Sequence, residues 1–309
     1  MRHVITLTDL SDVDICHIVA RGCEFAAEPG QPSPTLDGAI VGTYFRKTST
    51  RTRTGFTAGA LRLGGRVIAY GPDDLQLNTG ETVADTARVL GRMVDILVAR
   101  TAGTDEELRE WAAPDGISVV NAMSAAEHPT QALADLTTLQ ATFGGIDSLR
   151  VLYVGEGNNT AAALALALTR FPTVHLELRT PLGYGLAPTV QARARRQAAA
   201  SAATFVERHD MDDLPAGCDV VYTTRWQTTG TSKPDPDWRR LFAPFQVDAT
   251  LWKNSPDARF MHDLPAHRGE EVTADVLDGP ASIAFDQAAN KMFSAMAVLE
   301  WCYGGRGRR

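Results

Sequence analysis

The sequence predicts an α/β protein with two doubly wound parallel-sheet domains. Runs that favour β-strands alternate with helix-compatible runs along nearly the whole chain, and this alternation is typical of βαβ units, which build parallel sheets. The chain has 309 residues, enough for two domains of about 150 residues that each bury their own core. The pair Gly144-Gly145 ends a helical run near the middle of the chain. We therefore place a domain boundary there.

The composition describes a globular protein rather than a nucleic-acid or membrane protein. Hydrophobic residues make up 44% of the chain, charged residues make up 22%, and the net charge is −7. An acidic balance disfavours general binding of nucleic acid. The chain has no apolar run of about 18 residues, and its first residues lack the apolar segment of an export signal. We expect a cytoplasmic protein without a membrane partner.

The four cysteines do not indicate a disulfide framework or a thiolate metal site. Cys16, Cys23, Cys218 and Cys302 are scattered and form no Cys-x-x-Cys pair. Paired spacing is the usual sign of a zinc site or a redox motif. We expect reduced thiols and no metal.

The first half of the chain reads as one helix followed by alternating strands and helices. Thr8 or Ser11 can cap a helix that ends near Ala27, where a stretch rich in proline and glycine follows. The elements predicted after it are a strand at 39–44, a helix from 57, a strand at 65–70, a helix at 81–93, a strand at 95–100, a helix at 104–112 and a strand at 117–122.

The second half repeats the pattern after a helix at 131–143 whose apolar residues keep helical spacing. The elements predicted next are a strand at 149–154, a helix at 160–170, a strand at 173–178, a helix at 188–202, strands at 219–224 and 259–263 and a last helix at 288–303. The tail at 304–309 is expected to be flexible.

The stretch from Ser49 to Arg53 predicts an anion site. It lies where a strand leads into a helix, and the free N–H groups and the helix dipole of such an N-terminus favour a bound phosphate. Ser49, Thr50 and Thr52 add hydroxyl donors, while Arg51 and Arg53 add planar guanidinium groups. A polar helix start with solvated arginines is the alternative for these residues taken alone.

A dinucleotide site is disfavoured. Gly155-Glu156-Gly157 follows a predicted strand, but the third glycine of the fingerprint is replaced by Thr160. We predict no cofactor.

Motifs along the chain match one known family in its expected order. Ser49-Thr50-Arg51-Thr52-Arg53 resembles the carbamoyl-phosphate motif of the aspartate/ornithine carbamoyltransferase family. The set is closer to the ornithine branch than to the aspartate branch. The later matching motifs are Asp85-Thr86-Ala87-Arg88-Val89-Leu90, Arg100, His128-Pro129-Thr130-Gln131, Gly155-Glu156-Gly157-Asn158-Asn159, Thr180-Pro181-Leu182-Gly183-Tyr184 and His262-Asp263-Leu264-Pro265-Ala266.

The resemblance implies a domain plan and an assembly. Residues 1–145 would bind carbamoyl phosphate and residues 146–287 the acceptor, with inter-domain helices joining the two. Residues 288–309 would supply a C-terminal helix that packs back on the first domain, followed by the flexible tail. The family also implies a homotrimer.

The implied reaction is attack of an amine on the carbonyl of carbamoyl phosphate, with phosphate as the leaving group. Arg100 and His128 match the residues that polarise the carbonyl, where negative charge develops. Lys291 stands where the family usually has arginine, so a compact ammonium group replaces a planar guanidinium group that could donate two parallel hydrogen bonds. The matching carbamoyl-phosphate ligands are Ser49, Thr50, Arg51, Thr52, Arg100, His128, Gln131, Asp263, Leu264 and Lys291.

The acceptor side departs from the ornithine pattern. The family run Asp-x-x-x-Ser-Met-Gly, which holds the amino-acid backbone of ornithine, has become Thr224 to Gly230, with Thr228 and Thr229 inside it. The cysteine of the His-Cys-Leu-Pro motif has become Asp263, which we predict to hold the acceptor ammonium and accept its proton. Asn159 matches the residue that binds the acceptor's α-carboxylate.

These changes favour an acceptor other than free ornithine. The preferred prediction is a diaminopropionyl side chain in a peptide antibiotic pathway of the viomycin and capreomycin kind. Ornithine or N-acetylornithine in arginine metabolism is the alternative. Two other classes of protein compete with this prediction. One is a regulatory relative that binds carbamoyl phosphate without catalysis, and the other is an unrelated α/β nucleotide enzyme.

Overall fold

The structure, a computed structural model, describes residues 1–228 and 232–305 of the chain. Thr229 and the last four residues of the expected flexible tail lie outside the described residues. The chain divides into two compact units. Unit 1 comprises Met1–Ala141 and Ala289–Arg309, and unit 2 comprises Thr142–Ala288.

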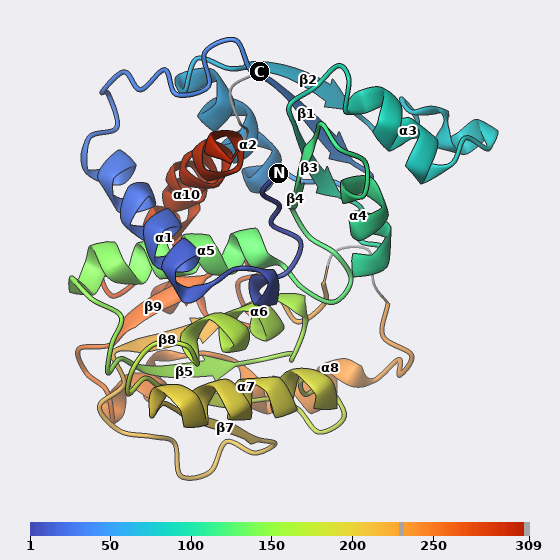
Figure 1. The fold of residues 1–309 in the computed structure, drawn as a ribbon. Coiled ribbons are helices and arrows are strands. Elements are labelled where there is room, and N and C mark those ends of the chain that lie inside the picture. The colour runs from blue at the N-terminus through green and yellow to red at the C-terminus, as the bar shows by residue number, and fades with distance from the viewer. Residues whose placement is uncertain (229–231, 306–309) are drawn as a thin grey trace. The chain divides into compact units, whose positions relative to one another are not determined.

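Unit 1 is a four-stranded parallel sheet with helices between its strands (Figure 1). The strand order is β2-β1-β3-β4, and every pair is parallel. Its strands are β1 (Ile40–Phe45), β2 (Arg66–Tyr70), β3 (Ile96–Arg100) and β4 (Ser118–Asn121). Its helices are α1 (Asp12–Ala27), α2 (Arg51–Arg62), α3 (Val83–Leu90), α4 (Asp105–Ala112), most of α5 (Pro129–Phe143), most of α10 (Ala284–Gly304), and the short 3-10 helices η1 (Leu7–Asp9) and η2 (Gln76–Thr79).

Local sequence signals set several helix starts in unit 1. The side chain of Ser11 accepts a hydrogen bond from Asp14 N at the start of α1. Thr82 and Thr104 cap α3 and α4 in the same way. Such caps satisfy backbone donors that would otherwise lack a partner. These starts fall within two residues of the predicted ones.

Helix α2 begins at Arg51, six residues before the predicted start at 57. The predicted helix was too short because glycine and threonine are poor helix formers. Here they serve packing instead: a Cβ on Gly55 would lie 3.4 Å from the Lys291 carbonyl oxygen, and one on Gly59 would lie 3.0 Å from Met296 Cγ. The glycines therefore let α2 approach α10 closely.

Unit 2 is a five-stranded parallel sheet with the order β7-β6-β5-β8-β9. Its strands are β5 (Arg150–Val154), β6 (His175–Arg179), β7 (Thr204–Arg208), β8 (Val220–Thr223) and β9 (Arg259–His262). Its helices are α6 (Asn159–Leu168), α7 (Pro188–Ser201), α8 (Trp238–Phe242), α9 (Ala274–Leu277) and the short 3-10 helices η3 (Ala243–Phe245) and η4 (Ala249–Lys253).

The sequence did not predict strand β7. This strand pairs with β6 alone in its sheet, and its residues are exposed or partly exposed. An edge strand needs no continuous apolar run, so its five residues carry little sequence signal.

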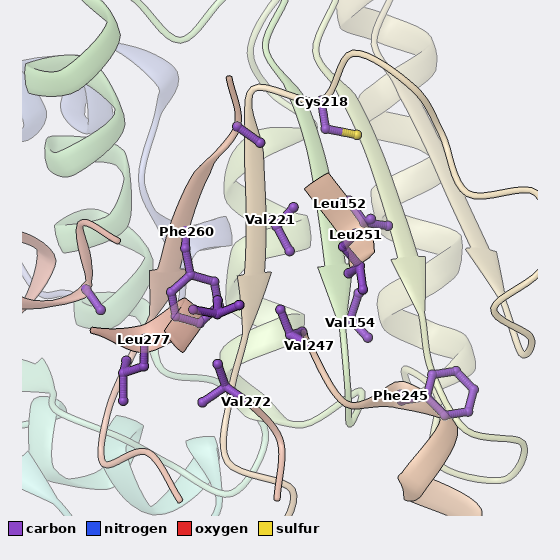
Figure 2. Close-up of a cluster of buried hydrophobic side chains, with 13 residues drawn as sticks. Leu152, Val154, Cys218, Val221, Phe245, Val247, Leu251, Phe260, Val272 and Leu277 are labelled. Carbon is purple, nitrogen blue, oxygen red and sulfur yellow. The ribbon is translucent and has the colours of Figure 1, made fainter. Parts of the chain in front are cut away.

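One core cluster of unit 2 packs against the sheet. Figure 2 shows side chains from β5, β8 and β9 meeting side chains from the segments that contain Val247, Leu251 and Leu277. Phe260 of β9 is fully buried within this cluster. The cluster fixes the relative positions of β5, β8 and β9, whose carboxyl ends lead into residues that the sequence predicts for the acceptor site.

The prediction of two parallel-sheet α/β domains is confirmed. In unit 2, β5 has β6 on one side and β8 on the other. The direction of the chain connections therefore reverses at β5, and ligands in such sheets bind beyond the carboxyl ends of the strands at this point.

Candidate active site

The predicted anion site lies at the carboxyl ends of β1 and β3. Phe45, the last residue of β1, is in register with Arg100, the last residue of β3. Ser49 and Thr50 follow β1 and lead into α2. Thr50 is the residue before the helix, and its hydroxyl makes no capping hydrogen bond. Arg51 and Thr52 begin the first turn, where backbone N–H groups and the helix dipole favour an anion.

Arg53 has a packing role. Its guanidinium carbon lies 5.6 Å from the centroid of the Phe45 ring, a distance typical of a cation–π contact. Its backbone N–H donates to Ser49 Oγ at 3.3 Å. Arg53 thus supports the turn between β1 and α2.

Lys291 joins this site through a buried polar chain. Its Nζ donates to Gln131 Oε1, and Gln131 Nε2 donates to Asp135 Oδ1 at 2.7 Å. The second bond fixes the orientation of the Gln131 amide, whose oxygen therefore faces the Lys291 ammonium. Thr52, Thr130 and Lys291 line one small cavity.

His128 is a buried, neutral imidazole. Burial lowers its pKa well below the ordinary value of 6.5, and the nearby positive charges of Lys291 and Arg100 lower the pKa further. Its Nδ1 lies 3.3 Å from Thr130 Oγ1. A neutral ring can donate one N–H to a developing oxyanion without bringing a third buried charge.

In unit 2, Asp263 is held by two hydroxyl groups. Thr224 Oγ1 donates to Asp263 Oδ1 at 2.8 Å, and Thr160 Oγ1 donates to Oδ2 at 2.9 Å. Strand register explains the first bond: Thr223 pairs with His262, so Thr224 and Asp263, which directly follow β8 and β9, lie side by side. The carboxylate side chain is 14% exposed.

His262 does not supply a positive charge to Asp263. Its Nδ1 lies 3.5 Å from Asp263 Oδ1 but accepts a hydrogen bond from Leu264 N at 2.8 Å. Its Nε2 lies 3.2 Å from Glu271 Oε1 and carries the proton of this neutral tautomer. Within the described part of unit 2, no arginine or lysine forms an ion pair with Asp263.

The turn from β5 to α6 places the two asparagines differently. Asn158 caps α6, because its Oδ1 accepts from Thr160 N and Ala161 N. Its Nδ2 donates to Thr228 Oγ1 at 3.2 Å. Asn159 is the first residue of α6 and is buried. The structure thus brings Thr160, Thr224 and Asp263 together, and Asn158 with Thr228.

Sequence reasoning missed several residues of this region. In the sequence, Thr160 was notable only because it stands in place of the third glycine of the dinucleotide fingerprint. The ion pair between Glu156 and Lys233 was not predicted. The position of Thr160, in the first turn of a helix that follows a strand, could have pointed to a functional role. Hydroxyl residues are common at helix starts, however, so this signal is weak.

The glycine-rich turn serves packing. A Cβ on Gly157 would lie 2.3 Å from the backbone carbon of Gly185. This close approach accounts for the second glycine of the Gly-x-Gly pattern.

The described residues, 1–228 and 232–305, contain neither a recognisable metal site nor a membrane-spanning helix. No group of three or more histidine, cysteine, aspartate or glutamate side chains there could hold a metal ion. No helix among them is long and apolar enough to cross a bilayer.

Family models cover most of the chain. Residues 2–141 match the carbamoyl-P binding domain of aspartate/ornithine carbamoyltransferases, and residues 147–302 match the Asp/Orn binding domain.

Similar proteins and structures are carbamoyltransferases by name. The chain is 42% identical over 277 residues to an ornithine carbamoyltransferase of Thermococcus kodakarensis, covering 89% of this chain and 87% of that protein. The structure of the ornithine carbamoyltransferase from Pyrococcus furiosus matches with a TM-score of 0.92 at 39% identity, over 99% of this chain and 98% of that one. The catalytic subunit of M. Jannaschii aspartate transcarbamoylase matches with a TM-score of 0.83 at 29% identity, covering 97% of each chain.

Proposed function

This chain belongs to the aspartate/ornithine carbamoyltransferase family and is a carbamoyltransferase, and we propose that its acceptor is the side-chain amine of ornithine or of a closely similar amino acid. The relatives support ornithine as the acceptor over a peptide-borne diaminopropionyl side chain. Curated relatives near 40% identity, over nearly the whole chain, are named ornithine carbamoyltransferase. No comparison supports a role in antibiotic biosynthesis.

One contact carries the proposal: the hydrogen bond between Thr224 and Asp263. The sequence replaces the family carboxylate that holds the amino-acid backbone of ornithine with Thr224, and it predicts that Asp263 holds the acceptor ammonium. In the fold, Asp263 lies directly beside Thr224, at the end of the neighbouring strand. Compared with the family pattern, the carboxylate therefore follows β9 instead of the neighbouring strand β8, and we assign it to the acceptor.

Asp263 suits an ammonium ligand. A largely buried carboxylate without a cationic partner is costly, and an ammonium of opposite charge offsets that cost. Thr160 donates to one carboxylate oxygen and Thr224 to the other, so each oxygen accepts one hydrogen bond. Each oxygen still has a lone pair for the acceptor. Asn159, in the first turn of α6, would bind the acceptor's α-carboxylate.

The reaction needs a neutral amine. An amine of pKa near 10 is neutral in only about one molecule in a thousand at pH 7. In our proposal Asp263 holds the ammonium and takes its proton, and the amine nitrogen then attacks the carbonyl carbon of carbamoyl phosphate. The bond from that carbon to the phosphate oxygen breaks, the phosphate leaves with the electron pair, and the leaving phosphate takes the second proton from the attacking nitrogen.

On the carbamoyl-phosphate side, unit 1 would supply the charge. Ser49, Thr50, Arg51 and Thr52 would hold the phosphate at the start of α2. Arg100 and the neutral His128 would donate to the carbonyl oxygen as it becomes negative. Gln131 accepts from Lys291, so we assign the Gln131 and Lys291 pair, together with Leu264, to the carbamoyl group.

The test is phosphate release from carbamoyl phosphate with a panel of amines. The panel contains ornithine, N-acetylornithine, putrescine, diaminopropionate and a diaminopropionyl peptide. Ornithine as the best acceptor supports the proposal. Turnover only with the peptide or with an acylated amine overturns it and restores the acceptor that the sequence predicted.

A charge relocation sharpens this test. The variant D263N should lose at least a hundredfold in kcat/KM for ornithine, because the only carboxylate of the Thr224 and Asp263 pair is gone. The double variant T224D/D263C restores the family pattern and should recover ornithine turnover. Failure of both the wild type and this double variant with ornithine would contradict the proposed acceptor.

We also propose the homotrimer that the family resemblance implies. Light scattering coupled to size exclusion should give about three times the 33.3 kDa of one chain. A monomeric mass with full activity would contradict it.

A further inference from the structure

Lys233 of unit 2 is a buried lysine enclosed by one carboxylate and three aromatic rings. Its side chain is 4% exposed, and its Nζ lies 2.5 Å from Glu156 Oε1. The same nitrogen lies 4.6 Å from the ring centroid of Tyr184, 5.2 Å from that of Trp238 and 4.6 Å from that of Phe242. We call these five residues the lysine cage.

The lysine cage is a complete site for an ammonium group. Burying an ammonium is costly unless opposite charge and polarisable surfaces replace the lost water. Glu156 supplies the charge, and the faces of the three rings supply cation–π attraction. Trp226 packs on the outside of the cage, with its ring centroid 5.6 Å from that of Phe242. A single charge is thus fixed in one place.

The cage is assembled on the turn that carries the acceptor residues. Glu156 lies in the turn between β5 and α6, three positions before Asn159. In the same turn, Gly157 N donates to the carbonyl oxygen of Tyr184 at 2.7 Å. Lys233 thus contacts Glu156 of this turn and also Tyr184, whose carbonyl oxygen accepts from Gly157 of the same turn.

The turn is also tied to the segment that follows β8. Thr228 accepts from Asn158, and Lys233 binds Glu156. Asn158 and Glu156 of the turn thus bind Thr228 and Lys233 of this segment. The segment starts with Thr224, which lies next to Asp263. The lysine cage lies at the far end of this segment from Thr224.

We propose that Lys233 is a positioning residue whose ammonium fixes the turn from β5 to α6, and thereby sets the places of Asn159 and Thr160 for the acceptor. This inference rests on the proposed function, in which those two residues serve the acceptor side. It assigns a role in acceptor affinity to a lysine whose ammonium is enclosed by protein side chains. Carbamoyl phosphate, which the first unit would bind, should not depend on Lys233.

The kinetic test compares K233M with K233R, using the best acceptor of the panel. K233M keeps an unbranched stem and removes the charge, so the acceptor KM should rise about tenfold. The KM for carbamoyl phosphate should stay within twofold. K233R keeps the charge and should recover most of the acceptor affinity. The exposed Lys253 provides the matched control K253M, which should behave as wild type.

A merely structural lysine would give a different pattern. K233M would then lower the melting temperature while the acceptor KM stayed unchanged, and this outcome overturns the proposal. A rise of both KM values by the same factor also overturns it. The double variant K233M/E156Q should be no worse than K233M alone, because the two charges act through one contact.

Hydrogen exchange provides a readout that needs no acceptor. In K233M, the backbone amides of Gly157, Thr160 and Ala161 should exchange faster than in wild type, while those of α7 should not change. Unchanged exchange at the turn overturns the inference. If no amine of the panel is carbamoylated, the proposed acceptor fails, whereas the exchange result still decides whether Lys233 fixes the turn.

Discussion

The hydroxyl of Thr160 donates to Asp263 Oδ2 at 2.9 Å, although 103 positions separate the two residues in sequence. Thr224 satisfies the other oxygen of the same carboxylate. Thr160 lies in the first turn of α6 and Thr224 directly follows β8, so the carboxylate is oriented from both sides. Loss of either hydroxyl should leave the carboxylate in place but less well aimed.

The variant T160V tests this orientation. Valine has nearly the shape of threonine but no donor, so Oδ2 loses its hydrogen bond. Hydrogen bonds to charged groups contribute about 1.5 kcal/mol or more, and kcat/KM for the acceptor should fall about tenfold. The KM for carbamoyl phosphate should not change. T189V, at an exposed position of α7, is the control, and equal kinetics for T160V and T189V would refute the role.

Lys291 should matter for carbamoyl phosphate and for the charge state of His128. K291M removes the cation that contacts Gln131, so the KM for carbamoyl phosphate should rise at least tenfold. Because the charge of Lys291 lowers the pKa of His128, that pKa should also rise, which NMR titration of the ring can measure. K291R should correct both changes. A His128 pKa that is the same in K291M and wild type would argue against an electrostatic effect of Lys291 on His128.

His128 should make the protein less stable in mild acid. Its folded pKa is lowered from 6.5, first by burial and then by Lys291 and Arg100. Above pH 6.5 the ring is neutral in both states and adds no pH dependence. Below pH 6.5 the unfolded chain binds a proton that the folded chain does not, so the free energy of unfolding falls, by up to about 1.4 kcal/mol per pH unit.

Urea unfolding of wild type and H128N between pH 5 and pH 8 measures this effect. The two proteins should differ in slope below pH 6.5 and run parallel above it. Identical slopes below pH 6.5 would show that His128 takes up its proton in the folded state.

Gly157 should not tolerate a side chain. In G157A, the new Cβ would lie 2.3 Å from the backbone carbon of Gly185 and 2.4 Å from Leu186 N, and backbone atoms cannot move aside cheaply. We expect a loss of about 2 kcal/mol in the free energy of unfolding, together with weaker acceptor binding. G145A is the matched control, because nothing lies within 4 Å of a Cβ there. Equal stability of the two variants would contradict the packing argument.

Much of the fold could be predicted from local patterns. The alternation of strand and helix, the caps at Ser11, Thr82 and Thr104, and the buried runs of β3 and β8 are signals within a few residues. The edge strand β7 and the early start of α2 could not be predicted. Their formation depends on a neighbouring strand and on a closely packed helix, which local propensity does not contain.

For the candidate site, the sequence determined the residue types and their order along the chain, and these placed the chain in its family. It also showed that one carboxylate is absent at position 224 and another is present at position 263. Only the tertiary structure decided that these changes concern one place, because the register of β8 and β9 brings together residues that are 39 positions apart. The lysine cage has the same origin. Its residues come from three separate segments, and a contact between distant segments depends on how the sheet and its turns pack.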